Sequence, residues 1–241
     1  MESVLITGAA GHVGFALTQK FFHEGWRVFA TCLPKDRMPA FTEFAEHSQG
    51  RVRMFDLDIT DAQNIASVAT TLKNEPIDVL FNVAGLTVQS DIVFGQTDYD
   101  LWDKHFAINT KGPMRMCEAF APHVIASKRK VMMTISSRMG AKPNYGFVGY
   151  RATKSAVSQV MFQVGLALKD KGVIAAACHP GWVRTKNNDN KGSLSPEQSA
   201  AMLYNVVVNL TPEDNFKFFD PDGTTLPLVT QQTQPKPYAM T

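Results

Sequence analysis

The chain has 241 residues, of which 44% are hydrophobic and 19% charged, and its formal net charge at pH 7 is +2. These values are ordinary for a globular protein long enough to form one α/β domain, and so small a net charge gives no electrostatic argument for nucleic acid as a partner. Because no apolar run reaches the roughly 18 residues of a membrane span, and the first strand begins too early for a signal sequence, we expect a cytoplasmic protein without membrane contact.

A glycine-rich turn joins the first expected strand to the first expected helix. Residues 4–6 read as a buried strand, and Val13, Leu17 and Phe21 recur at helical spacing in a helix expected over 11–24. Glycines in the turn would let backbone N–H groups at the helix start approach a pyrophosphate. A tight turn without a ligand is the alternative interpretation of the glycines alone. The candidate cofactor contacts here are Gly8, Gly11, His12, Val13 and Gly14.

The second expected strand, 27–33, ends where a dinucleotide-binding fold meets the adenosine ribose. An acidic residue at this end would select NAD, but Cys32 and Leu33 occupy it, and Lys35 and Arg37 follow at once. Nothing there would repel a 2′-phosphate, and two cations would attract it. We therefore expect NADP as the preferred cofactor, with NAD as the alternative.

Asp58 follows the third expected strand, which covers 51–57 after a short helix over 39–49. A carboxylate there would accept a hydrogen bond from an adenine amino group, whereas a loop aspartate that caps the next helix is an equally supported interpretation. Thr60 and Gln63 match the two ends of a capping box, so we expect Thr60 to start the next helix.

Small residues follow the fourth expected strand, 77–81, and permit a close approach of the backbone to a cofactor. An ordinary turn is the alternative interpretation of this segment, which is Asn82, Val83, Ala84 and Gly85. Helices are expected next over 98–110 and 113–127. Asn109 falls inside the first of them, where asparagine is a poor helix former, so we expect its side chain, or a water that it holds, to have a specific role.

The fifth expected strand begins at Val131 and ends in Ser136 and Ser137. In the following helix, Tyr150 and Lys154 share one face because they are four residues apart. Ser137 would reach the same point from the end of the strand. These three side chains outline a proton-transfer site, and for Ser136 we expect only a packing or backbone-capping role.

The helix expected over 150–169 is apolar on more than one face, which favours burial against both the sheet and a second subunit. We therefore expect a homodimer or homotetramer, with a central helix in a monomer as the alternative.

A sixth strand is expected over 173–178, followed by a Pro-Gly segment over 180–185. The cysteines form no paired motif, so we expect reduced thiols, no disulfide scaffold and no metal site. They are Cys32, Cys117 and Cys178.

A helix to about residue 210 is expected to open at Ser195, because Pro196 and Gln198 complete the pattern of a capped helix start. A polar flap over 187–193 precedes it, and a last strand over 216–219 follows. We expect a single domain over 1–230 with a substrate loop at about 184–212, and a flexible tail over 231–241.

The alternation of strands and helices predicts an α/β fold of the Rossmann type, doubly wound around a mainly parallel, seven-stranded sheet with helices on both faces. Ligands of such a fold bind outside the carboxyl ends of the strands. Every motif described above lies at such an end, and this shared placement carries more weight than any single motif.

Over nearly its whole length the chain resembles the short-chain dehydrogenase/reductase family in its compact form. The residues that carry the resemblance are the turn from Thr7 to Gly14, Asp58, the segments 82–85 and 180–185, and the spaced set Asn109, Ser137, Tyr150 and Lys154. Within the family, the C-factor and carbonyl-reductase-like branch is similar at 150–154, 179–183 and 217–223.

The resemblance implies an NAD(P)-dependent oxidoreductase that transfers hydride between nicotinamide and a carbonyl or secondary alcohol, with Tyr150 as the acid or base. The implied catalytic residues are Asn109, Ser137, Tyr150 and Lys154. The implied cofactor contacts beyond the glycine turn are Asp58, Asn82, Ala84, Gly85, Tyr150, Lys154, Pro180, Gly181, Val183 and Thr185.

Roles for the catalytic residues follow from the same resemblance. Ser137 would hold the carbonyl oxygen, Lys154 would bond the nicotinamide ribose, and Asn109 would hold a water that links Lys154 to solvent. Lys154 is also expected to lower the pKa of Tyr150, since a unit charge at about 4 Å in an effective dielectric of about 20 contributes about 4 kcal/mol. That energy matches a fall of about 2 to 3 pKa units, which brings a phenol near neutrality.

The chain departs from the usual family pattern at His12, which follows Gly11 beside the expected phosphates, and at Val83, which replaces a second asparagine. Two alternatives stay open: reduction of a 3-oxoacyl thioester on an acyl carrier, and a non-catalytic NADP-binding sensor or signalling protein. The small-molecule substrate is not identified. Residues that suggest an apolar, partly aromatic pocket, but occur as often in cores, are Met139, Tyr145, Phe147 and Trp182.

Overall fold

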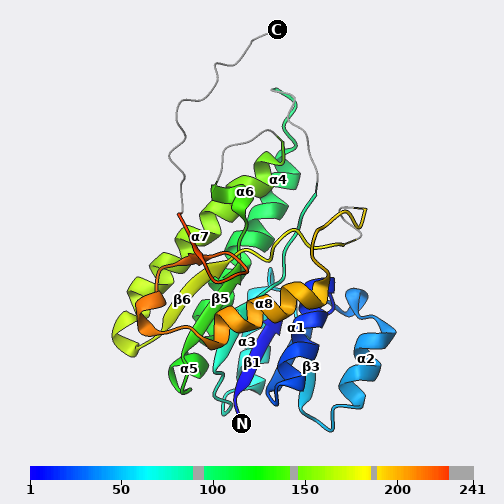
Figure 1. Ribbon diagram of the computed structural model, residues 1–241, viewed down its shortest axis with the longest axis vertical. Helices are drawn as coiled ribbons and strands as arrows, with labels where there is room; N and C mark the ends of the chain where they lie inside the picture. Colours follow the sequence, from blue (N-terminus) through cyan, green and yellow to red (C-terminus); the bar gives the residue numbers. More distant parts are fainter. Residues whose placement is uncertain (89–94, 142–145, 186–188, 228–241) are drawn as a thin grey trace.

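Eight strands form one sheet in the order β3-β2-β1-β4-β5-β6-β7-β8 in the computed structural model, which describes residues 1–88, 95–141, 146–185 and 189–227 (Figure 1). Strands β1 to β7 run parallel, and β8 pairs antiparallel with β7. The strands are β1 (Ser3–Thr7), β2 (Arg27–Cys32), β3 (Val52–Asp56), β4 (Val79–Asn82), β5 (Val131–Ile135), β6 (Ile174–Cys178), β7 (Phe218–Phe219) and β8 (Thr225–Leu226).

The two faces of the sheet carry separate hydrophobic cores, because side chains alternate along each strand. In β1, Val4 and Ile6 belong to one core and Leu5 to the other. The first core is covered by α1 (His12–His23), α2 (Pro39–Glu46) and α8 (Pro196–Val208), and α1 and α8 cross in front of the sheet in Figure 1. The second core is covered by α3 (Ala62–Thr71), α5 (Gly112–Ile125) and α7 (Val148–Leu168).

The strand order reverses at β1, which lies between β2 and β4. In an open parallel sheet, a crevice for ligands forms at the carboxyl ends of the strands at such a reversal. The Rossmann-type α/β fold predicted from the sequence is therefore confirmed.

The sheet has one strand more than the seven predicted. The additional strand, β8, covers only Thr225–Leu226 and closes a hairpin on β7. Two residues are too few to show the alternation by which a strand is recognised in a sequence, which explains why the prediction omitted it.

The predicted start of α3 at Thr60 is wrong. Asp61 is the N-cap of α3, and its carboxylate accepts hydrogen bonds from the backbone N–H groups of Gln63 and Asn64. Thr60 instead donates its hydroxyl and its N–H to Asp58. A threonine and an aspartate compete here for the same role, and the carboxylate is the stronger acceptor at a helix N-terminus.

The start of α8 agrees with the prediction. Ser195 accepts a hydrogen bond from the Gln198 backbone N–H at 3.2 Å, and the Gln198 side chain accepts one from the Ser195 N–H at 2.8 Å. Helix α7 begins at Val148, two residues before the predicted start, after Phe147 turns the chain in the left-handed region with φ of 55°. Some predicted features lie wholly or partly outside the described residues, namely Tyr145, the flap over 187–193, the substrate loop at about 184–212 and the tail over 231–241.

Helices α4 (Tyr99–Phe106) and α5 are joined by a π-helical segment, η2 (Ala107–Lys111), rather than by a break. Asn109 lies in the middle of η2 and is only 1% exposed. A π-helical turn inside an α-helix is rare and frequently marks a functional site. The backbone is therefore unusual at Asn109, the same position for which a specific side-chain role is expected.

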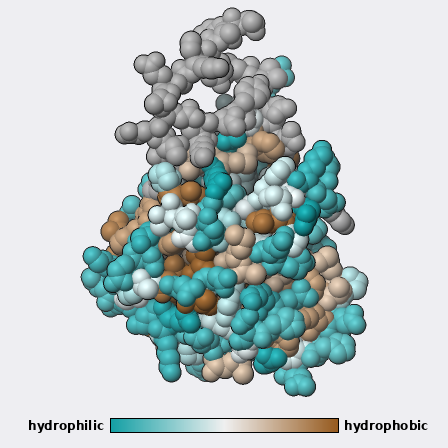
Figure 2. Space-filling view, in the orientation of Figure 1, coloured by the Kyte–Doolittle hydropathy of each residue, from teal (hydrophilic) through white to brown (hydrophobic). Residues whose placement is uncertain are grey.

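Figure 2 shows hydrophilic side chains over most of the visible face, with apolar ones gathered in a hollowed region near its middle. Among the described residues, no helix combines the length and apolar character that a bilayer crossing requires.

Candidate active site

The turn between β1 and α1 is packed backbone against backbone. Gly8 has φ of +64°, and a Cβ on it would lie 2.7 Å from the Ala84 Cα. A Cβ on Gly14 would lie 2.2 Å from the Gly8 carbonyl oxygen. Both contacts are far shorter than real Cβ contacts, so these two glycines are required by the protein's own packing.

Gly11 differs from the other two glycines of the turn. A Cβ built on Gly11 meets one atom within 4 Å, the Gly8 carbonyl oxygen at 3.3 Å. Gly11 is also the N-cap of α1, and no side chain caps the first N–H groups of that helix. Backbone donors at a helix start with no side-chain acceptor form an anion site, and the missing Cβ at Gly11 leaves the approach to them open.

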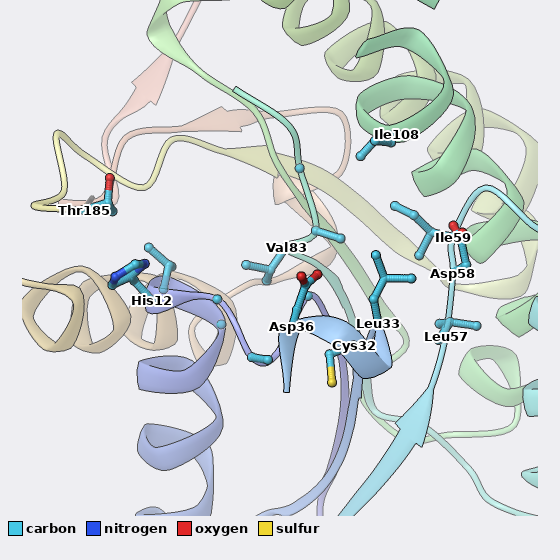
Figure 3. A pocket seen from close by; sticks show the side chains of 17 residues that line it. His12, Cys32, Leu33, Asp36, Leu57, Asp58, Ile59, Val83, Ile108 and Thr185 are labelled. Carbon is cyan, nitrogen blue, oxygen red and sulfur yellow. The ribbon is translucent and has the colours of Figure 1, made fainter. Parts of the chain in front are cut away.

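A cavity of about 380 Å³ lies over this helix start (Figure 3). His12 and Thr185 lie on one side of it in the view, and Leu33, Leu57, Asp58 and Ile59 on the other. Nine of the predicted cofactor contacts line this cavity: Gly8, Gly11, His12, Val13, Gly14, Asp58, Ala84, Gly85 and Thr185.

Asn82, also predicted as a cofactor contact, does not line the cavity. Its amide donates to the Thr134 hydroxyl at 3.2 Å and to the Cys117 sulfur at 3.7 Å, and its buried Oδ1 has no hydrogen-bond partner among the residues that the structure describes. Burial raises the pKa of the Cys117 thiol to about 12, so this sulfur is a neutral acceptor. The geometry gives Asn82 the task of tying β4 to β5 and α5.

Three predicted contacts after β6, Pro180, Gly181 and Val183, also lie outside the cavity lining. The Pro180 carbonyl accepts the Ser199 hydroxyl at 2.6 Å, and Gly181 has φ of +83°. Val183 forms a β-bridge with Leu194. These contacts fix the path of the segment that carries Thr185 to the cavity.

The end of β2 differs electrostatically from the expectation. Asp36, in the 3₁₀ turn η1 (Pro34–Asp36), lines the cavity together with Cys32 and Leu33, whereas Lys35 and Arg37 do not. The Arg37 guanidinium is paired with Asp56. The premise that nothing here would repel a 2′-phosphate is therefore wrong, because the Asp36 carboxylate is part of the wall.

Asp58 is held in place at the far wall of the cavity. Its Oδ1 accepts the Thr60 N–H at 2.8 Å and the Thr60 hydroxyl at 2.7 Å, and its own N–H donates to the Asn64 side chain at 2.7 Å. These bonds orient a carboxylate whose second oxygen has no hydrogen bond among the described residues.

The predicted proton-transfer side chains come together, and Lys154 lies beside Gly85. Lys154 is 3% exposed, and its ammonium lies 5.6 Å from the centre of the Tyr150 ring. A Cβ on Gly85 would lie 3.7 Å from the Lys154 Nζ and 3.4 Å from the Asn109 Oδ1. Because Gly85 also lines the cavity, the lysine and asparagine stand directly behind its wall.

The pKa of Tyr150 is raised rather than lowered. Burial is the largest cause, and hydrogen bonds with the Thr87 and Ser137 side chains act against it. The Lys154 ammonium donates instead to the Ile135 carbonyl at 2.8 Å, and burial lowers its pKa to about 8. The expectation of a lowered pKa for Tyr150 is therefore wrong in this geometry, because burial outweighs the effects that favour the phenolate, and the phenol keeps its proton at neutral pH.

Ser136 and Ser137 face different surroundings although they are adjacent. The Ser136 hydroxyl donates to the Lys154 carbonyl at 2.9 Å and lies 2.7 Å from the Ser158 hydroxyl, which confirms a packing role. The Ser137 hydroxyl accepts the Met139 N–H at 3.1 Å and bonds Tyr150.

The Asn109 side chain clamps the segment after β4. Its Oδ1 accepts the Leu86 N–H at 2.7 Å, and its Nδ2 donates to the Leu86 carbonyl at 2.9 Å and to the Thr153 hydroxyl at 3.1 Å. Its amide hydrogens are therefore engaged with protein. The predicted water between Asn109 and Lys154 stays a prediction.

Together, the glycine turn, the cavity, the half-buried tyrosine and the buried serine and lysine form an arrangement that fits a known enzyme family. The family model described as short chain dehydrogenase matches residues 2–194. The chain belongs to the short-chain dehydrogenase family. It is accordingly an NAD(P)-dependent oxidoreductase.

Individual relatives agree with this assignment. An uncharacterized oxidoreductase of Schizosaccharomyces pombe is 30% identical, with 92% of this chain and 96% of the relative covered. The carbonyl reductase Sniffer of D. melanogaster has the same fold, with a TM-score of 0.87, 21% identity, and coverage of 94% of this chain and 99% of that one. A short-chain dehydrogenase/reductase of Burkholderia multivorans, solved with bound NADP, has a TM-score of 0.82 and 25% identity, with 93% and 98% covered.

Two residues of this family member were missed by the sequence reasoning. Thr87 bonds the Tyr150 phenol, and the available signal was its place two residues after Gly85 in a segment expected to approach the cofactor. Asp36 lines the cavity because η1 turns back toward it, and its signal was the Pro34 that starts this turn.

Proposed function

We propose that this short-chain dehydrogenase reduces a carbonyl group to a secondary alcohol, with Tyr150 as the proton donor. The observation that carries the proposal is the Tyr150 phenol, which is hydrogen-bonded to Ser137 and lies beside the buried Lys154. A bound nicotinamide cofactor would supply the hydride to the carbonyl carbon. All other tasks fall to side chains and backbone groups of the chain.

The residues around the cavity fit such a cofactor. The uncapped N–H groups at the start of α1 would bind the pyrophosphate, with Gly11 leaving room for it. Asp58 presents an oriented carboxylate to which an adenine amino group would donate. Ala84 and Gly85 would lie beneath the cofactor, and Thr185 would contact its nicotinamide end.

The raised pKa of Tyr150 supports the reductive direction. A phenol that keeps its proton at neutral pH is ready to give it to the oxygen of a carbonyl as the carbon receives hydride. The Ser137 hydroxyl would donate a second hydrogen bond to the same oxygen. Lys154, charged below its pKa of about 8, would stabilise the phenolate that remains.

The decisive test is Tyr150→Phe, assayed by the fall in absorbance at 340 nm of NADPH and NADH with a panel of ketones, aldehydes and a 3-oxoacyl thioester. We expect turnover to fall by about 10³-fold or more, because proton transfer contributes about 10² to 10⁴, while cofactor affinity by fluorescence titration is unchanged. Tyr204→Phe is the matched control, since Tyr204 packs on Phe21 and Trp26 in another part of the molecule. Undiminished turnover in Tyr150→Phe would refute the proposal, and cofactor binding without turnover of any compound by the wild type would favour a sensor.

The preference between NADP and NAD has support on both sides. The NADP in the Burkholderia relative and the cation of Lys35 support NADP. Asp36 in the cavity wall and the pairing of Arg37 with Asp56 oppose a 2′-phosphate. We propose that the enzyme accepts both and that Asp36 limits the use of NADP. Asp36→Asn should therefore raise the ratio of kcat/KM for NADPH to that for NADH about three- to tenfold, and an unchanged ratio would refute this role.

We further propose that the enzyme is a homodimer or homotetramer in which α7 meets a second copy. Leu166 on α7 is 58% exposed, a large apolar side chain on a helix whose other side packs on the sheet. Light scattering of the wild type and of Leu166→Lys tests this, since the charge should dissociate the assembly. A single domain over 1–230, the substrate loop at about 184–212 and a cytoplasmic location stay predictions.

A further inference from the structure

Arg138, the residue directly after Ser137, forms a two-point ion pair with Asp220. Its Nε donates to Oδ1 at 2.7 Å and its Nη2 donates to Oδ2, across 82 residues of sequence. Asp220 is only 4% exposed. A fork of two parallel N–H···O bonds fixes orientation as well as distance, so the position of Arg138 depends on that of Asp220.

Asp220 is itself anchored by the β7–β8 hairpin. Its N–H donates to the Thr224 carbonyl at 2.8 Å, and its carbonyl accepts the Gly223 N–H at 3.0 Å. The preceding residue, Phe219, pairs with β6 and accepts the His179 N–H at 2.7 Å. The carboxylate therefore stands on the sheet rather than on a free loop.

The segment that carries Ser137 has little structure of its own. Ser137 leads into α6 (Arg138–Ala141), a single turn in which the Gly140 N–H bonds the Ser137 carbonyl at 2.9 Å. Helix α7 holds one side of this turn, through Arg151, which donates to the Met139 carbonyl at 3.1 Å, and through Ser155, which donates to the Gly140 carbonyl. Asp220 holds the turn from the hairpin, through Arg138.

Charge balance supports the same conclusion. Arg138 and Lys154 are both close enough to His179 to contribute, after burial, to lowering its pKa to about 4. Asp220 is the buried carboxylate that neutralises Arg138 in this group. Without it, the Arg138 guanidinium would lose its ion-pair partner, and the turn would lose its connection to the hairpin.

We propose that Asp220, acting through Arg138, is a positioning residue that holds the Ser137 hydroxyl in place for the reaction, so that the β7–β8 hairpin is part of the catalytic apparatus. This inference rests on the proposed carbonyl reduction. It predicts that loss of the ion pair acts through Ser137, whereas a purely structural pair would affect stability and every catalytic residue alike.

The test is a double-mutant cycle on kcat with the best carbonyl substrate. Asp220→Asn and Arg138→Gln should each lower kcat about tenfold, since small misplacements of catalytic groups cost up to about 10²-fold, with cofactor affinity unchanged. In a Ser137→Ala background, the same two substitutions should change kcat less than twofold. Asp214→Asn is the matched control, because Asp214 is a carboxylate that pairs with Lys217 just before β7, and Arg138 is not among the groups that shift its pKa.

The outcomes separate this inference from the proposed function. Equal losses in the wild-type and Ser137→Ala backgrounds, or an unchanged kcat in both single variants, would overturn it while leaving carbonyl reduction intact. A wild type without turnover would instead refute the proposed function. Arg138→Gln guards against misfolding of the Asp220 variant, because the replaced side chain is 49% exposed.

Discussion

The two halves of the site are built in opposite ways. The β1–α1 turn makes its half from backbone, with Gly8 and Gly14 packed so closely that no side chain fits. The ends of β5 and β6 and the start of α7 make the other half from side chains, among them the buried Ser137 and Lys154 and the half-buried His179. A backbone half is sensitive to added volume, whereas a half made of buried polar groups is sensitive to protonation and to the loss of single hydrogen bonds.

The largest difference in kcat is expected between variants of two neighbouring residues of the polar half, Ser136 and Ser137. Ser137→Ala should lower kcat by about 10² to 10³-fold, because it removes a donor from the reacting oxygen. Ser136→Ala should leave kcat within about threefold and lower only stability, since its hydroxyl bonds the Lys154 carbonyl. Steady-state kinetics and thermal melts distinguish them, and similar losses of kcat in both variants would contradict the assignment.

In the backbone half, the comparison is between Gly14 and Gly11. Gly14→Ala should lower the free energy of unfolding by about 2 to 4 kcal/mol, because its Cβ would collide with the Gly8 carbonyl. Gly11→Ala should cost less than about 1 kcal/mol and instead weaken cofactor binding about tenfold, since its Cβ would fill the approach to the helix start. Urea unfolding and fluorescence titration measure the two effects, and unchanged cofactor affinity in Gly11→Ala would argue against a pyrophosphate there.

Acid should destabilise the protein through histidines whose imidazoles are partly or fully buried. The pKa values of His105, His123 and His179 are all lowered mainly by burial, that of His179 to about 4. The unfolded chain therefore takes up protons first, and stability that is complete above about pH 6.5 is lost as the pH falls toward 4. The loss from His179 alone is up to about 3 kcal/mol.

Urea midpoints measured from pH 7.5 to 4.5 check this dependence. His179→Gln should flatten the curve, and substitution of the exposed His23 by glutamine should not. A wild-type midpoint that does not change with pH over this range would refute the assignment.

The smallest effect is expected in the pH profile of reduction. Lys154 has a pKa lowered to about 8, so kcat/KM should be nearly level up to pH 7 and fall about tenfold between pH 7 and 9. The raised pKa of Tyr150 keeps the phenol protonated throughout this range. A profile that falls only above pH 10 would show that the charge of Lys154 is not required.

Much of this site could be predicted because its signals are local. The glycines of the first turn and the four-residue spacing of Tyr150 and Lys154 each reflect one short segment whose geometry follows from backbone rules. The capping box at Ser195 was predicted for the same reason, whereas at Thr60 two local acceptors competed and the pattern alone could not rank them.

The features that the sequence did not predict depend on contacts between segments that are distant in the sequence. The Arg37–Asp56 pair removes a cation from the expected phosphate, and burial overrides Lys154 in setting the pKa of Tyr150. The residues next to a charged group in the sequence show neither how deeply the group is buried nor which residue pairs with it. The same holds for Arg138, which begins α6 after β5, and Asp220, which follows β7. These two residues come into contact only in the folded chain.

The π-helical segment η2 has a consequence for changes in chain length. A π-turn holds one residue more than the α-helical turn it replaces, so deleting one residue from 107–111 would let α4 and α5 continue as a regular helix. Each residue of an α-helix advances by about 100° around its axis, and the deletion would therefore turn the helix before it relative to the helix after it. Asn109 could no longer grip Leu86 and Thr153 at once, and a shorter, more regular helix would leave the active site without its clamp.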